Sequence, residues 1–103
     1  MRYQLVLQFS ASSIADYDDL ITIEDALIKE LSRVADVDGH DCGSDEMNVF
    51  IFTNAPEEVF EKTKSVLAKC NKLENLTVAF REAGGDKYRT LWPIGSDKPF
   101  RIT

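Results

Sequence analysis

The chain has 103 residues, 44% of them hydrophobic and 29% charged, so it is long enough to bury one core and does not have a disordered composition. Its net charge of −6 is unevenly placed, because residues 1–79 have a balance of −8 and residues 80–103 a balance of +2. An acidic body repels phosphate backbones, which disfavours a nucleic-acid partner and suits a basic protein partner.

The N-terminal segment shows no signal-peptide core or cleavage site, and no apolar run in the sequence approaches the length of a membrane span. We therefore expect a cytoplasmic protein with no membrane association, folded as a single domain over residues 1–103. Cys42 and Cys70 are the only cysteines. We expect both to be structural thiols in a reducing compartment.

Residues 2–9, RYQLVLQF, alternate between two sets of side chains and predict a strand with one face in a core. From about residue 16 to residue 34 the apolar period becomes that of a helix. The start of this helix is open between Asp16 and Thr22. The predicted apolar stripe consists of Leu20, Leu27, Leu31 and Val34, widened by Ile21, Ile23 and Ile28.

Residues 36–53, DVDGHDCGSDEMNVFIFT, predict a hairpin whose turn is GSDE and whose second arm is a central strand. Residues 54–71 predict a second helix that begins near Pro56. Residues 76–94 predict two further strands around a Gly-Gly-Asp turn. In the remaining tail, Phe100 and Ile102 indicate a segment that docks on the domain.

This order predicts an α+β fold, namely a ferredoxin-like βαββαβ sandwich with one additional C-terminal strand. The antiparallel sheet would have the strand order 4-1-3-2, with the extra strand beside strand 4 and both helices on one face. The other face would be open and half apolar, lined by Gln4, Val6, Gln8, part of the VFIF segment and Trp92. Such a face favours a homodimer, a ligand cleft or a protein partner.

His40, the only histidine, is the first candidate for chemistry. Strand alternation would place Asp38 and Cys42 on its face, so a Cys42 thiolate beside an imidazole oriented by Asp38 is one hypothesis. The alternative interpretation is an edge strand whose polar residues prevent edge-to-edge pairing. We favour the edge-strand interpretation, because adjacency of such residues in a sequence arises easily by chance.

The C-terminal part offers a second candidate, because Arg81, Lys87 and Arg89 lie close in sequence to Tyr88 and Trp92. Cations interleaved with aromatic rings can bind an anion. The alternative is an ordinary strand with one solvated side. One histidine and scattered carboxylates do not make a metal site, and we expect neither a metal nor a cofactor.

The segments MRYQLVLQF, IEDALIKEL, GHDCG running into the Asn48 strand, and LWP together resemble a group of small bacterial proteins of similar length. That resemblance implies a bacterial, cytoplasmic, single-domain protein and carries over no activity and no site residues. The fold is also similar to that of dimeric α+β barrel proteins and of small-molecule-binding regulatory domains, which is an analogy of fold alone.

These observations favour a non-enzymatic protein-interaction or binding domain, comparable in size and charge to inhibitor or immunity proteins. Two alternatives stay open. One is a small cofactor-independent dimeric enzyme with His40 as acid or base, and the other is a small-anion-binding regulatory domain that uses Arg81, Lys87 and Arg89.

Overall fold

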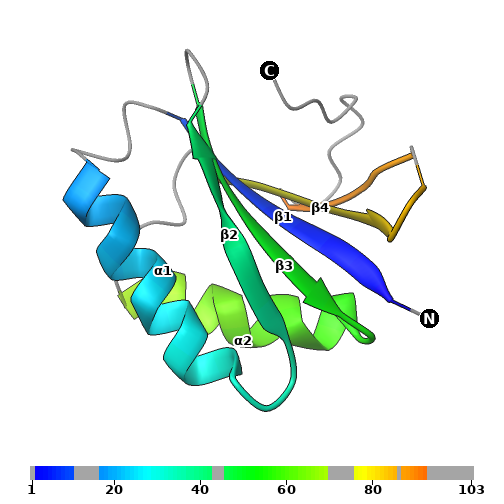
Figure 1. The fold of residues 1–103 in the computed structure, drawn as a ribbon, viewed down its shortest axis with the longest axis horizontal. Helices are drawn as coiled ribbons and strands as arrows, with labels where there is room; N and C mark the ends of the chain where they lie inside the picture. Colours follow the sequence, from blue (N-terminus) through cyan, green and yellow to red (C-terminus); the bar gives the residue numbers. More distant parts are fainter. Residues whose placement is uncertain (1, 11–16, 43–45, 70–75, 86, 93–103) are drawn as a thin grey trace.

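The computed structural model describes residues 2–10, 17–42, 46–69, 76–85 and 87–92, with residues 17–19 and 42 described by their backbone alone. Expectations for Asp16, Cys70 and the tail at Phe100 and Ile102 lie outside the described residues. Figure 1 shows the strands and helices found within those ranges. They are β1 (Tyr3–Ser10), α1 (Tyr17–Leu31), β2 (Asp36–Cys42), β3 (Glu46–Thr53), α2 (Pro56–Lys69), β4 (Leu76–Glu82) and β5 (Arg89–Trp92).

The described strands form one five-stranded antiparallel sheet in the order β2-β3-β1-β4-β5. α1 connects β1 to β2, α2 connects β3 to β4, and each connection passes over one intervening strand. This is the strand order predicted from the sequence, including the fifth strand beside the fourth. The described part of the chain therefore has an α+β architecture.

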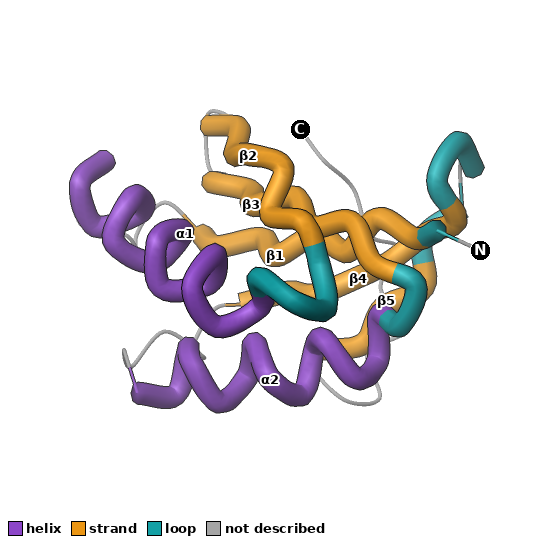
Figure 2. The backbone as a smooth tube through the Cα atoms, turned by 60° about the horizontal axis from the view of Figure 1, so that its bottom comes forward, coloured by secondary structure: helices purple, strands orange, loops and turns teal. Residues whose placement is uncertain are grey.

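Both helices lie on the same side of the sheet, as Figure 2 shows. The register makes Leu5 a neighbour of Ile51 and Phe80, so odd residues of β1 share one face with these residues of β3 and β4. That face packs on the buried stripes of the helices. The stripes are Leu20, Ile23, Leu27 and Leu31 in α1, and Val59, Phe60, Val66 and Leu67 in α2.

α1 ends at Leu31, one turn before the end predicted from the sequence. The carbonyl of Leu31 accepts hydrogen bonds from the N–H groups of both Val34 and Ala35, at 2.9 Å each, which closes the helix and turns the chain toward β2. Val34 is consequently 44% exposed, and its predicted place in the apolar stripe is wrong. The predicted place of Ile28 is wrong as well, because its side chain is 46% exposed. The turn before Thr22 belongs to the same helix.

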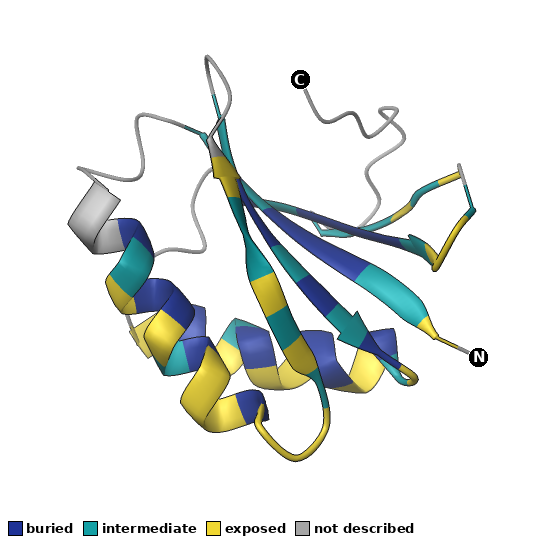
Figure 3. Cartoon of the chain, viewed as in Figure 1, coloured by how far each residue is buried: buried dark blue, intermediate teal, exposed yellow. Residues whose placement is uncertain are grey.

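The sheet face opposite the helices differs from expectation. Val6, Asn48 and Ala79 on this face are fully buried, whereas Phe50 and Phe52 are only half-buried. The prediction that Val6 lines an open face is therefore wrong, because the centre of this face is closed to solvent within a single chain. Figure 3 shows the buried residues following the middle of the sheet and the inner sides of the helices.

Within the described ranges, neither helix has the length and apolar character that crossing a membrane requires.

Candidate functional site

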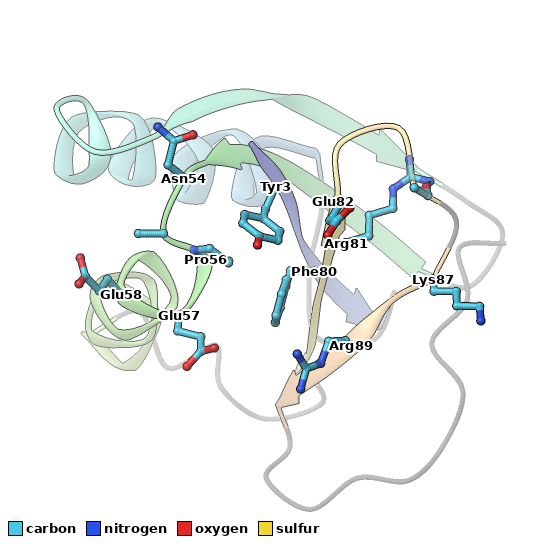
Figure 4. Close-up of a pocket in the computed structure, with 12 residues that line it drawn as sticks. Tyr3, Asn54, Pro56, Glu57, Glu58, Phe80, Arg81, Glu82, Lys87 and Arg89 are labelled. Carbon is cyan, nitrogen blue, oxygen red and sulfur yellow. The ribbon is translucent and has the colours of Figure 1, made fainter. Parts of the chain in front are cut away.

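A cleft of about 800 Å³ lies between the start of α2 and the β4–β5 hairpin, on the helix side of the sheet (Figure 4). Small-molecule sites in proteins commonly enclose roughly 300–1,000 Å³ and combine an apolar surface with a few polar groups. The lining residues are Tyr3, Asn54, Ala55, Pro56, Glu57, Glu58, Phe80, Arg81, Glu82, Gly85, Lys87 and Arg89. The cleft therefore has the size and the mixed lining of a ligand site.

Two aromatic rings form the floor of this cleft. Tyr3 and Phe80 face the helices from neighbouring strands, and their rings meet edge to face with centroids 5.7 Å apart and planes at 77°. Phe80 is almost buried, at 7% exposed, whereas Tyr3 is half-buried. Edge-to-face pairs are a favoured aromatic geometry, so the floor is a stable apolar surface with one phenol at its margin.

One wall of the cleft is the first turn of α2. The N–H of Val59 donates to the carbonyl of Ala55 at 3.0 Å, so Ala55 is the N-cap residue and Pro56 the first residue of the helix. Thr53 fixes this start, because its Oγ1 accepts from the N–H of Ala55 at 3.0 Å and donates to the carbonyl of Val34 at 3.2 Å. Alanine has no side-chain acceptor, so the N-cap side chain satisfies none of the helix's first N–H groups.

The opposite wall is the start of β5. Arg89 pairs with Phe80 across the strands, and its guanidinium lies over the Phe80 ring, 5.9 Å from the centroid. The hairpin that carries it turns at Gly84, whose φ of 86° is a conformation that glycine adopts most readily. The side chain of Arg89 is exposed, so its charge meets both the cleft and the solvent.

The structure brings Arg81, Lys87 and Arg89 onto this one cleft but aims only Arg89 into it. Arg81 donates from Nε to Gln4 Oε1 at 2.8 Å and from Nη1 to the carbonyl of Gly85 at 2.7 Å. Its guanidinium also lies 5.1 Å from the ring centroid of Tyr88. Figure 4 shows Lys87 pointing away from the cleft.

Trp92, the fourth predicted binding residue, lies outside the cleft, and its predicted place on the open sheet face is wrong because it lies on the helix side. Its ring packs on Phe60 of α2 with centroids 6.1 Å apart, and Lys64 Nζ lies 5.5 Å from the Trp92 centroid. It does not line the cleft. Trp92 therefore helps to hold β5 against α2, which fixes the position of the wall that carries Arg89.

His40 lies on the helix side of the edge strand β2, opposite Val49. Its Nδ1 is 3.0 Å from Oε2 of Glu24 in α1, and the two side chains are 21% and 12% exposed. The carboxylate that orients the imidazole is thus Glu24, which the sequence analysis had not selected. This pair joins α1 to the edge strand, and His40 does not line the cleft.

Of the other two residues of the predicted histidine site, the structure describes the side chain of Asp38 alone. The pairing of β2 with β3 shifts between Val37 and Gly39, which makes Asp38 the extra residue of a β-bulge, and its side chain is exposed. Cys42 ends β2 opposite Met47, and its side chain is outside the description. Within the described ranges, no group of three or more His, Cys, Asp or Glu residues is placed to hold a metal ion.

Sequence reasoning missed Tyr3 and the first turn of α2 as parts of the site. The alternation of β1 assigned Tyr3 to the core, although a tyrosine at the end of a strand has a polar group to place. The Asn54-Ala55-Pro56 start gave a second signal, because it lacks a side-chain cap at the N-cap position.

Comparison of the sequence with models of protein families, with curated proteins and with solved structures found no match.

Proposed function

We propose that this chain is a non-enzymatic binding domain that holds a small organic molecule in the cleft between α2 and the β4–β5 hairpin. The observation that carries the proposal is the cleft itself, about 800 Å³ in volume with an aromatic floor. Most of the other lining residues are polar or charged, and Glu57, Glu58, Glu82, Lys87 and Arg89 are exposed, so polar groups surround the apolar floor and can orient a ligand.

Binding is favoured over catalysis by the character of the lining. Among the described residues, the lining does not include His40, and its glutamates and its Arg89 are exposed to solvent. Catalytic acids, bases and nucleophiles are usually placed where burial or a close charge alters their reactivity. An exposed rim of this kind orients a ligand rather than transforms it.

We further propose that the architecture is ferredoxin-like. The support is the antiparallel order β2-β3-β1-β4 with both helices on one face, to which β5 adds a fifth strand at the edge. In this arrangement the start of α2 and the end of β4 meet at the same end of the sheet. The cleft is therefore a consequence of the topology, and the β4–β5 hairpin supplies its outer wall.

Association through the face opposite the helices, as a homodimer or with a protein partner, remains a prediction. The half-buried rings of Phe50 and Phe52 support it, whereas the full burial of Val6 and Ala79 limits the apolar area that a partner would cover. Native mass spectrometry of the purified protein tests the dimer directly, and a monomer at tens of micromolar would remove it.

The cleft proposal is tested by protein-observed NMR with a library of small fragments that includes neutral, anionic, cationic and zwitterionic compounds. Bound fragments should shift the amide signals of Tyr3, Glu57 and Arg89. The amides of Asn48 and Thr77, on the opposite face, are the control and should not move. A library that shifts none of the cleft signals, or that shifts only the opposite face, contradicts the proposal.

A further inference from the structure

We infer that the ligand of this cleft is a small zwitterion with an apolar body. Its carboxylate binds Arg89, its ammonium binds Glu57, and its apolar body covers the rings of Tyr3 and Phe80. This inference rests on the binding function proposed above and specifies the ligand class for the same site.

The charges of the cleft carry the inference. Figure 4 shows Glu57 on the α2 wall and Arg89 on the β5 wall, with Phe80 between them. The ion pairs among the described residues are Arg2–Asp36, His40–Glu24 and Lys64–Glu61, so neither Glu57 nor Arg89 belongs to one. Two opposite charges thus stand on facing walls of one cavity without neutralising each other.

Glu82 also lines the cleft, opposite Tyr3 in the pairing of β1 with β4, and adds a second carboxylate to that of Glu57. The other charged residues of the lining contribute less to the interior. Arg81 is held by Gln4 and by the carbonyl of Gly85. Figure 4 shows Glu58 and Lys87 directed away from the centre of the cleft. The ligand therefore meets the guanidinium of Arg89 on the β5 wall, the carboxylate of Glu57 on the α2 wall, and the carboxylate of Glu82 at the end of β4.

A ligand of a single charge fits this pair poorly. A simple anion at Arg89 would approach the carboxylate of Glu57, and a simple cation at Glu57 would approach the guanidinium of Arg89, so each would meet a repulsive group. A zwitterion places an opposite charge at both walls. The sequence analysis proposed a small-anion site from Arg81, Lys87 and Arg89 alone. Because glutamates line the same cleft, we expect it to disfavour such anions.

The geometry of each wall suits its half of the ligand. A guanidinium can bind a carboxylate through two parallel hydrogen bonds, and Arg89 can do so while its plane remains near the Phe80 ring. The edge-to-face rings of Tyr3 and Phe80 present an apolar surface to a side group of the ligand. An aromatic or large aliphatic side group would gain most from this floor.

The test is an NMR titration of the whole protein with five probes that differ in one feature at a time. L-Phenylalanine and the dipeptide phenylalanyl-alanine carry both charges and a ring, 3-phenylpropionate lacks the ammonium, 2-phenylethylamine lacks the carboxylate, and glycine lacks the ring. Of the two zwitterionic ring compounds, the one with the higher affinity should bind at least about fivefold more tightly than each of the other three probes.

Two variants assign the charges to their walls. Arg89→Ala should bring the affinity of that zwitterion down to the affinity of 2-phenylethylamine. Glu57→Gln should bring it down to the affinity of 3-phenylpropionate. Arg33→Ala is the matched control, because Arg33 is an exposed arginine outside this cleft, and it should leave all affinities unchanged.

The outcomes separate the inference from the function on which it rests. If 3-phenylpropionate or 2-phenylethylamine shifts the cleft signals and binds as tightly as the zwitterions, the ligand class is wrong and the binding site stands. The same holds if other fragments bind the cleft and no zwitterion does. If neither these probes nor the fragment library perturbs the cleft, both proposals fail.

Discussion

Two buried threonines allow the same substitution to be tested in opposite hydrogen-bonding environments. Thr63 in α2 is fully buried, and its Oγ1 has no hydrogen-bond partner in the described part of the chain. Thr53 at the end of β3 is 5% exposed, and its Oγ1 donates to the carbonyl of Val34 and accepts from the N–H of Ala55. Replacing each by valine keeps the shape of the side chain and removes only the hydroxyl.

The expected effects have opposite signs. A buried polar group without a partner costs roughly 1–3 kcal/mol, so Thr63→Val should raise the free energy of unfolding by about 1 kcal/mol or more. Valine and threonine have similar helix propensities, so the backbone adds little. Thr53→Val removes two hydrogen bonds with net values of about 0.5–1.5 kcal/mol each, and it should lower the free energy of unfolding by about 1–3 kcal/mol.

Urea unfolding followed by circular dichroism measures both values, with unchanged m-values as the check that only stability has moved. Thermal unfolding should agree, because a change of 1 kcal/mol shifts the Tm of a domain of this size by roughly 4–8 °C. The reasoning is refuted if Thr63→Val destabilises the protein as much as Thr53→Val does, since the Thr63 hydroxyl would then have a satisfied environment.

Three other substitutions test the core and the histidine pair. Asn48→Leu should raise the free energy of unfolding by about 1–3 kcal/mol, because neither atom of the fully buried amide has a hydrogen-bond partner within the described residues; a loss of stability in urea unfolding would contradict this. Leu27→Ala should lower the free energy of unfolding by about 2–5 kcal/mol, because the side chain is fully buried between α1 and the sheet. A loss under about 1 kcal/mol would contradict this and show that the helix packs loosely. His40→Ala should lower the free energy of unfolding by about 1–3 kcal/mol, because it removes the partly buried hydrogen bond to Glu24. The affinity of cleft ligands should stay unchanged in the NMR titration, and a change in that affinity would place His40 in the site.

Much of the fold could be predicted from the sequence, because the periodicity of apolar residues depends directly on the local secondary structure. The period of two from Tyr3 to Phe9 defines a strand with a buried face, and the register confirms which residues share that face. The order of elements then restricts the sheet to few topologies. The end of α1 was not accessible, because Val34 is apolar and in phase, and the hydrogen bonds at Leu31 depend on where β2 must begin.

The candidate site was only partly accessible, since its residues come from β1, α2, β4 and β5. The basic residues of the hairpin are neighbours in sequence, so the pattern revealed them, but nothing local indicated that Glu57 faces Arg89. The partner of His40 illustrates the same limit. Strand alternation offered Asp38, whereas the bulge at that residue and the packing of α1 bring Glu24 to the imidazole.

The most direct test of the account is a measurement of intermolecular nuclear Overhauser effects between a bound zwitterionic ring compound and the aromatic protons of the protein. Each face of the sheet has its own reporters, because Tyr3 and Phe80 form the floor of the cleft and Phe50 and Phe52 lie on the opposite face. The account predicts contacts from the ligand ring to Tyr3 and Phe80. Contacts to Phe50 and Phe52 instead would contradict it and move the site to the other face.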